Sequence, residues 1–152
     1  MSNAIQINEK ESVPVLSVRT KAAVADLPKV MGEAFKAVMD YLGECGEAPA
    51  GAPFAAYYNM DMNDLDVEMG FPVAKKITGK GIITSSEIPA GKQVTCFYKG
   101  SYESMTEPYG EISQWMTQNG CEATGTSYEF YLNSPMEVPP DQLETIIMFP
   151  VK

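Results

Sequence analysis

The sequence contains an internal repeat, and no other feature restricts its possible folds as strongly. An offset of 74 residues aligns the two halves, without a gap, from a helix into the strand that follows it. After a longer loop in the second half, residues 70–73 align with residues 148–151. Self-similarity of this kind indicates a duplicated structural unit. The matched pairs are Phe35/Tyr109, Val38/Ile112, Tyr41/Trp115, Leu42/Met116, Gly46/Gly120, Gly51/Gly125, Tyr57/Tyr131 and Asn59/Asn133.

Each half is predicted to form a strand, a helix and two further strands. Apolar residues at helical spacing predict a helix from Asp26–Pro28 to Gly43–Gly46, and a second from between Ser104 and Thr106 to Gly120. Ser104 with Glu107 resembles a capping box at the start of the second helix. Alternating and β-branched runs predict strands at 13–18, 54–59, 65–73, 80–86, 92–98, 126–133 and 143–151, with a hairpin around Pro89–Gly91.

The predicted fold class is α+β, built from two βαββ units. One unit alone would leave a sheet face and a helix stripe unburied, so the two units are expected to pair with pseudo-two-fold symmetry and leave a cleft at their junction. A chain of 152 residues suggests one domain. We place it at residues 5–152, with repeats at about 13–76 and 80–152, and interpret residues 1–4 as a candidate cloning remnant.

The charge balance argues against direct binding to nucleic acid. The formal net charge is −9, and the sequence has neither a Lys/Arg stripe nor a helix-turn-helix segment. A negative surface would instead favour a cationic ligand or a basic protein partner, although the acidity could serve solubility alone. No apolar run is long enough for a membrane span, and we see no secretion signal.

The titratable residues restrict the chemistry further. There is no His, and Cys45, Cys96 and Cys121 are widely spaced, so we expect no zinc site and no Ser–His or Cys–His nucleophile. We expect no cofactor. The cysteines are interpreted as buried or idle thiols in a reducing cytoplasm. The acidic residues at 61, 64 and 66 are interpreted as a solvated turn rather than a calcium site.

Strand periodicity identifies Glu129 as the leading site candidate. In residues 127–132, we expect Tyr128, Phe130 and Leu132 on an apolar core face, and Ser127, Glu129 and Tyr131 on the opposite face. By the repeat, Ala55 matches Glu129 and Tyr57 matches Tyr131, so the cleft would hold one carboxylate and two tyrosines. A bound cation could satisfy this carboxylate, with help from the aromatic rings. The alternative is a solvent-exposed Glu129 paired with a lysine.

The remaining aromatic residues are weaker candidates. Trp115 and Tyr109 lie on a helix stripe that could simply be core, although Trp115 could also stack on a ligand. Tyr98 and Tyr102 flank Gly100 and could line the cleft or fasten the hairpin to the second helix. The predicted ligand-binding set is Glu129, Tyr131, Tyr57, Trp115 and Tyr98, with Glu129 as the catalytic residue if the protein is a hydrolase.

Several segments resemble the GyrI-like, or AraC-type effector-binding, domain family. They are PFAAYYN (53–59), DVEMGFPV (66–73), IPAG (88–91), KGSY (99–102) and YEFYLNSP (128–135), which with the helices span nearly the whole chain from Val13. The resemblance implies helices on one side of the sheet and a glutamate, at the position of Glu129, that contacts cationic aromatic ligands. Tyr131 matches the tyrosine usual two places later. The family often has His where Tyr98 stands.

This resemblance implies three candidate functions. The first is a stand-alone binding domain for a small hydrophobic, cationic or aromatic molecule. The second is a hydrolase of strained electrophilic compounds. The third is a protein-interaction role, such as modulation of gyrase through the acidic surface. With no DNA-binding segment in the sequence, we do not expect a self-contained transcription regulator.

Overall fold

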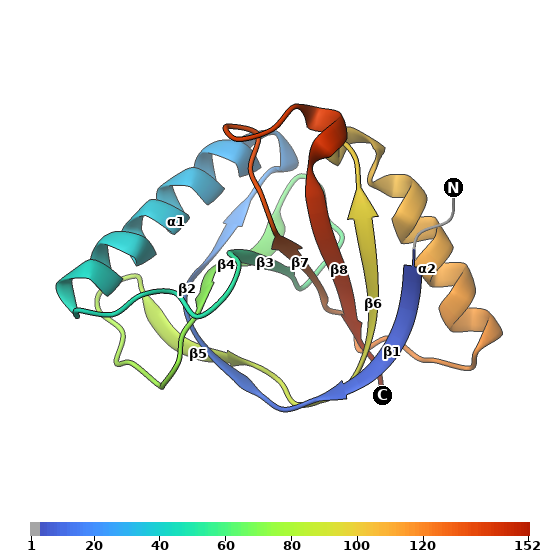
Figure 1. The fold of residues 1–152 in the computed structure, drawn as a ribbon, viewed down its shortest axis with the longest axis horizontal. Coiled ribbons are helices and arrows are strands. Elements are labelled where there is room, and N and C mark those ends of the chain that lie inside the picture. Colours follow the sequence, from blue (N-terminus) through green and yellow to red (C-terminus); the bar gives the residue numbers. More distant parts are fainter. Residues whose placement is uncertain (1–3) are drawn as a thin grey trace. The chain divides into compact units, whose positions relative to one another are not determined.

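The computed structural model describes residues 4–152 and shows an α+β fold with antiparallel strand pairing (Figure 1). The chain divides into two compact units. The first unit comprises Glu11–Ala90, and the second comprises Gly91–Lys152 together with the N-terminal strand through Lys10. No helix among the described residues is long and apolar enough to cross a membrane.

The first unit is a four-stranded antiparallel arrangement with one long helix, α1 (Leu27–Glu44). The strand order is β3-β4-β2-β5. Helix α1 packs on β2 and β4, and a short 3-10 turn (η1, Val24–Asp26) leads into it. The strands are β2 (Val13–Ala22), β3 (Phe54–Tyr57), β4 (Leu65–Pro72) and β5 (Thr84–Ile88).

The second unit has the same composition, with strand order β1-β6-β8-β7 and helix α2 (Thr106–Gln118) packed on β6. Two 3-10 turns, η2 (Tyr102–Ser104) and η3 (Pro140–Gln142), precede α2 and β8. The strands are β1 (Ala4–Lys10), β6 (Gly91–Lys99), β7 (Ser127–Tyr131) and β8 (Glu144–Pro150).

The internal repeat is confirmed by the hydrogen-bonding register. The series β2-α1-β3-β4 corresponds to β6-α2-β7-β8. Ala55 pairs with Met69 on β4, and its counterpart Glu129 pairs with Ile147 on β8. Each helix is followed by a glycine in the left-handed region, Gly46 at φ 70° and Gly120 at φ 67°. This conformation favours glycine, so these two positions end both helices in the same way.

The repeated asparagine of each unit holds the turn after a strand. The Asn59 side-chain oxygen accepts a hydrogen bond from the Asp66 amide (3.0 Å), and its amide group donates to the Asp64 carbonyl (3.2 Å). Asn133 likewise accepts from the Glu144 amide (2.9 Å) and donates to the Gln142 carbonyl (3.1 Å). The match of these two residues in the sequence therefore has a structural cause.

The first described residues form strand β1. Ala4, one residue before the predicted start of the domain, pairs with Phe97 on β6, and Ile5 packs against the core. Side-chain periodicity did not predict β1, because β1 is an edge strand with mostly exposed side chains. Residues 1–3 of the predicted cloning remnant lie outside the described part of the chain.

Two local predictions are wrong. The segments on either side of Pro89–Gly91 form β5 and β6 but not a hairpin, because β5 pairs with β2 while β6 pairs with β1 and β8. The capping box is also absent: α2 begins at Thr106 after Met105, with no side-chain cap. Ser104 instead ends the η2 turn, and its hydroxyl bonds that of Ser101.

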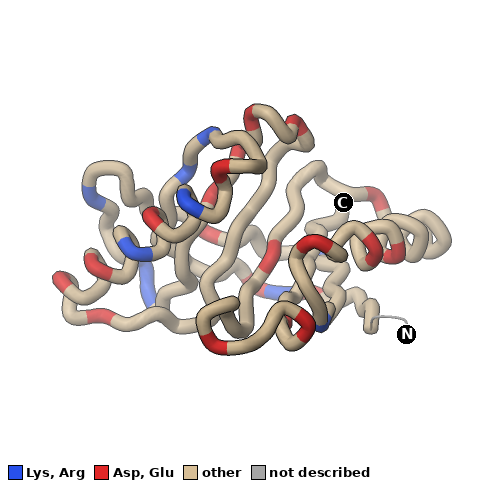
Figure 2. The backbone as a smooth tube through the Cα atoms, turned by 90° about the horizontal axis from the view of Figure 1, so that it is seen from above, with Lys and Arg blue, Asp and Glu red and all other residues tan. Residues whose placement is uncertain are grey.

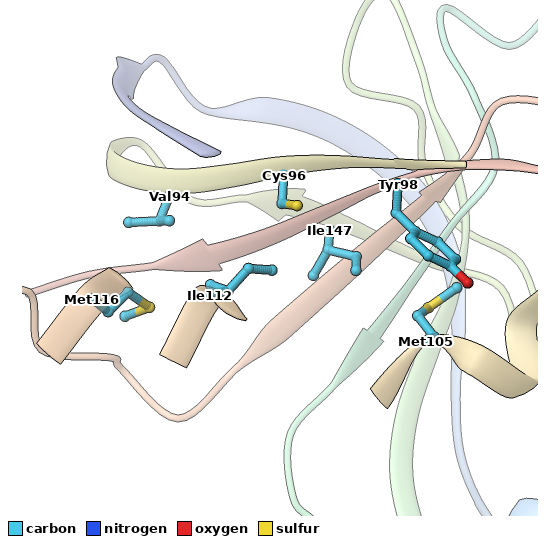
Figure 3. Packing of buried hydrophobic residues seen from close by; sticks show 7 residues of the cluster. All are labelled: Val94, Cys96, Tyr98, Met105, Ile112, Met116 and Ile147. Atoms are coloured by element: carbon cyan, nitrogen blue, oxygen red, sulfur yellow. The ribbon is translucent and has the colours of Figure 1, made fainter. Parts of the chain in front are cut away.

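The core of the second unit lies between α2 and the strands β6 and β8 (Figure 3). Apolar side chains at alternate positions of the strands meet the helix stripe, which is predicted from sequence at Ile112 and Met116. Ile5, Tyr109, Trp115, Cys121, Phe149 and Val151 pack around this cluster. The cluster itself consists of Val94, Cys96, Tyr98, Met105, Ile112, Met116 and Ile147.

Candidate functional site

Glu129 lies on the core-facing side of β7, beneath helix α2. Its cross-strand partner Ile147 belongs to the hydrophobic core, and directly paired residues of antiparallel strands project to the same face. Only 9% of the Glu129 surface is exposed. The predicted assignment of the two faces of β7 is therefore wrong in part: α2 covers the side of Glu129, and Leu132, assigned to the core, is exposed, whereas Tyr128 is buried as predicted. Strand periodicity separates two faces but does not say which one a helix covers.

Two tyrosine hydroxyls donate hydrogen bonds to the Glu129 carboxylate. Tyr109 reaches Oε2 from α2, and Tyr131, two residues along β7, reaches Oε1 at 2.9 Å. Among the residues that the structure describes, no Lys or Arg forms an ion pair with this carboxylate. The alternative of an exposed Glu129 paired with a lysine is therefore wrong.

Tyr102 completes the group that we call the Glu129 cluster: Glu129, Tyr109, Tyr131 and Tyr102. The Tyr102 ring, on the η2 turn, meets the Tyr131 ring edge-on, with centroids 5.8 Å apart and planes inclined at 71°. Tyr102 is 39% exposed, whereas Glu129 is buried. The ring pair is thus the outer part of the cluster and the carboxylate is the inner part.

Burial raises the pKa of Glu129 above its ordinary value, because a low-dielectric environment disfavours the charged form. The hydrogen bonds from Tyr109 and Tyr131 oppose this shift by stabilising the carboxylate, but desolvation is the larger cause. The pKa of Tyr102 is also raised, first by burial and then by the nearby charge of Glu129. The site therefore holds a carboxyl group whose charge is only partly compensated.

The charge distribution around the cluster is one-sided. Residues 100–151 contain eight acidic residues and no Lys or Arg (Figure 2). This stretch includes α2, β7 and β8, which supply or support the cluster. A negative potential of this kind attracts positively charged molecules.

The first unit carries an apolar version of the same site. Ala55 stands at the position of Glu129, and Phe35 at that of Tyr109. The ring packing is retained: Phe35 meets Phe71 edge-on at 5.7 Å, and Tyr109 meets Phe149 edge-on at 5.7 Å. The polar atoms are thus an addition to a shared packing arrangement. Comparing Phe35 with Tyr109 was the sequence signal that could have placed Tyr109 in the site rather than in the core.

The other predicted site residues have different surroundings. Tyr98 is buried in the core, and its hydroxyl donates to the Ser101 carbonyl (2.8 Å). Trp115 packs against the core cluster from α2. Tyr57 is half-buried on β3 of the first unit, where it pairs with Val67. Of these predicted ligand-binding residues, Tyr131 is the one shown above to donate a hydrogen bond to Glu129.

A second buried carboxylate, Glu68, lies in the first unit and was missed at the sequence level. The hydroxyls of Ser17 and Tyr58 donate hydrogen bonds to its two oxygens. The Arg19 guanidinium lies 3.9 Å from the Tyr58 ring centroid and forms a two-point contact with Asp66. Glu68 is therefore part of a closed network, in which a cation already covers the aromatic ring.

The remaining reactive groups give little support for other chemistry. Burial raises the pKa of the Cys96 thiol to about 11, which makes it a poor nucleophile, whereas Cys45 is exposed. No group of three or more His, Cys, Asp or Glu side chains within residues 4–152 is arranged to hold a metal ion.

The chain matches one family model and several solved structures. The family model, described as GyrI-like small molecule binding domain, matches residues 3–152. The DNA complex of EcmrR aligns with a TM-score of 0.86 at 23% identity, covering 100% of this chain and 58% of that one. The EcmrR C-terminal domain alone aligns with a TM-score of 0.80 at 22% identity, covering 100% of this chain and 99% of that domain's chain. This chain thus spans less than two thirds of the full-length EcmrR chain.

Two further similar structures are a hydrolase and a ligand complex. A hydrolase encoded by lin2189 from Listeria innocua aligns with a TM-score of 0.72 at 14% identity, covering 99% of this chain and 93% of that one. SAV2435 bound to tetraphenylphosphonium aligns with a TM-score of 0.72 at 10% identity, covering 98% and 94%. At these identities the likeness concerns the fold. A comparison with curated protein sequences finds no match.

Proposed function

Because the chain belongs to the GyrI-like small molecule binding domain family, we propose that it binds hydrophobic cations and that Glu129 neutralises their charge. One observation carries the proposal: a buried carboxylate whose partners within residues 4–152 are tyrosine hydroxyls, with no basic side chain among them. Burial of an unpaired charge is costly, and a bound cation would offset that cost.

The aromatic surroundings favour a delocalised or aromatic cation over a small hydrated one. The rings of Tyr102, Tyr109 and Tyr131 surround the carboxylate from three sequence positions, and ring faces attract cations. The surplus of acidic residues at 100–151 adds a longer-range attraction. SAV2435, which shares the fold, is a precedent for binding of tetraphenylphosphonium.

Calorimetry with tetraphenylphosphonium at pH 7.5 tests the proposal. We expect wild type to bind it, and Glu129→Gln to weaken binding by about 2–5 kcal/mol, because the variant keeps the shape but removes the charge. Triphenylphosphine oxide, a neutral analogue, should lose far less affinity in the same variant. The exposed Glu137 provides the matched control, as Glu137→Gln changes the net charge equally. Equal tetraphenylphosphonium affinity in wild type and Glu129→Gln would refute the proposal.

A hydrolase is the second candidate function, favoured by the raised pKa of Glu129 and by its hydrogen bonds to hydroxyl groups. A carboxyl group of this kind can act as general acid or base on a water molecule that attacks a strained electrophile. The similar structure from Listeria innocua, titled a hydrolase, is a precedent on the same fold. Turnover of strained electrophiles by wild type, lost in Glu129→Gln, would support it, and absence of turnover across such a panel would remove it.

A further inference from the structure

Thr145 has a buried hydroxyl that the fold leaves without a partner. It is fully buried on β8, and its Oγ1 is the one buried side-chain polar atom among the described residues with no hydrogen bond. Thr145 pairs with Tyr131 on one side and with Tyr98 on the other. It therefore lies on the same sheet face as Glu129, next to the tyrosine that bonds it. Such a hydroxyl lowers stability, because it loses water and gains nothing in exchange.

The repeat shows that the fold does not need this hydroxyl. The position equivalent to Thr145 in the first unit is Val67, which is also fully buried and pairs with Tyr57 as Thr145 pairs with Tyr131. Valine has nearly the same shape as threonine without the hydroxyl. The second unit thus differs from the first by three polar replacements on one face: Ala55 becomes Glu129, Phe35 becomes Tyr109 and Val67 becomes Thr145.

We propose that Thr145 is a second polar anchor of the ligand site, and that its hydroxyl hydrogen-bonds a polar group of the ligand whose cation pairs with Glu129. The inference rests on the proposed function and deepens it, since it names a ligand class: hydrophobic cations that also carry a hydroxyl, amide or ether group. The carboxylate of Glu129, which has no ion-pair partner among residues 4–152, and the unpartnered hydroxyl of Thr145 then contact the same ligand.

Access to Thr145 requires movement of the outer rings. Thr145 has no exposed surface, while Tyr131 is half-buried and Tyr102 is 39% exposed. The Tyr102–Tyr131 ring pair is the exposed side of the cluster, so a ligand that reaches both Glu129 and Thr145 displaces these rings. The Tyr131 side chain bonds Glu129, and Tyr131 pairs with Thr145, so we expect rotation of this side chain to accompany ligand entry.

A pair of probes tests the role of Thr145. The parent probe is tetraphenylphosphonium. Each derivative probe is the same cation with a single hydroxymethyl group at the meta or the para position of one ring, and it is compared with the parent. The readout is the ratio of the two Kd values within each protein. In wild type we expect at least one hydroxymethyl probe to bind about 3–10-fold more tightly than the parent. In Thr145→Val this preference should disappear, and in Thr145→Ser, which keeps the hydroxyl, it should remain.

Thr95→Val is the matched control. Thr95 is a half-buried threonine on β6 that pairs with Met148, so it lies on the opposite face of the same strands. This variant should keep the wild-type preference. Thermal unfolding without ligand adds an independent readout. Thr145→Val should lose the binding preference, yet its unfolding temperature should be at least that of wild type if the hydroxyl serves only the ligand.

The outcomes separate this inference from the proposed function. If Glu129→Gln weakens tetraphenylphosphonium binding but the hydroxymethyl preference is absent or survives in Thr145→Val, then the role of Thr145 is refuted and the cation site stands. If Glu129→Gln has no effect, the proposed function fails. If Thr145→Val does not fold, the hydroxyl is structural and the proposal fails. Loss of the preference in Thr145→Ser, which keeps the hydroxyl, would likewise refute a contact between this hydroxyl and the ligand.

Discussion

The hydroxyl of Tyr109 on α2 donates a hydrogen bond to the carboxylate of Glu129 on β7. This contact joins a helix to the sheet through polar atoms, at a place where the first unit has only the Phe35 ring and the Ala55 methyl group. The ring pairs Phe35–Phe71 and Tyr109–Phe149 pack alike in the two units. The site thus differs from the corresponding place in the first unit by its polar atoms.

Tyr109→Phe should raise the pKa of Glu129 further. The variant removes one of the two hydrogen bonds that stabilise the charged carboxylate, while desolvation remains. NMR titration of the labelled Glu129 carboxyl carbon would measure the change. Tyr98→Phe is the control, since its hydroxyl bonds the Ser101 carbonyl and not Glu129. A Glu129 titration identical in wild type and Tyr109→Phe would contradict the role given to this bond.

Glu129→Gln should stabilise the ligand-free protein more at pH 7.5 than at pH 4.5. Because the pKa of Glu129 is raised on folding, the unfolded chain loses its proton first as the pH rises. The wild type therefore loses stability from the ordinary Glu pKa up to the folded pKa, by about 1.4 kcal/mol for each pKa unit between them. Glutamine does not titrate, so the variant does not lose stability in this way.

Urea unfolding of wild type and Glu129→Gln at several pH values measures this difference, which should grow with pH. Glu137→Gln, at an exposed loop position, should show a nearly constant difference from wild type. A stability gap between wild type and Glu129→Gln that shrinks as the pH rises would show that the pKa shift has the opposite sign.

Asn59→Ala and Asn133→Ala should destabilise the protein by similar amounts. Each asparagine makes two hydrogen bonds to backbone groups across a turn, and a lost hydrogen bond costs about 0.5–1.5 kcal/mol. Chemical denaturation should therefore give about 1–3 kcal/mol for each variant. Asn63→Ala, with an exposed side chain in the first of these turns, should be nearly neutral. Neutral results at both repeated positions would show that the turns hold without them.

Gly70→Ala and Gly32→Ala should change stability in opposite directions. A Cβ atom on Gly70 would lie 2.0 Å from the Leu16 carbonyl oxygen, so β2 would have to move away from β4. On Gly32, within α1, a Cβ would meet nothing within 4 Å, and alanine is the better helix former by about 1 kcal/mol. Unfolding midpoints in urea should fall sharply for the first variant and rise for the second; a harmless Gly70→Ala would contradict the close approach.

Much of the fold could be predicted from sequence, because periodicity identifies the elements locally and the repeat supports the same assignment in both halves. The helix stripes at Val38–Leu42 and Ile112–Met116 and the glycine stops at Gly46 and Gly120 are where they were expected. Which strands pair with each other was harder to predict from sequence. Segments on either side of Pro89–Gly91 have hairpin composition, but the choice of partner depends on side chains that are distant in the chain.

The site was predicted only in part, for a similar reason. Glu129 and Tyr131 were found because they share one face of one strand. Tyr109 comes from a helix and was assigned to the core, since a helix stripe does not show which of its rings carries a hydroxyl that meets a carboxylate. Thr145 was not singled out from sequence. The repeat aligns it with Val67, but its missing hydrogen bond is visible only once every neighbour is placed.

Strand β1 has a consequence for the order of events during synthesis. Its partner β6 leaves the ribosome only after the whole first unit, since Ala4 pairs with Phe97 and Lys10 with Gly91. The first unit can therefore form its own strand pairs while the backbone N–H and C=O groups of β1 are still unpaired. Until β6 emerges, a nascent β1 is free to bind a chaperone or a neighbouring nascent chain, and β6 from a second copy could take the same place.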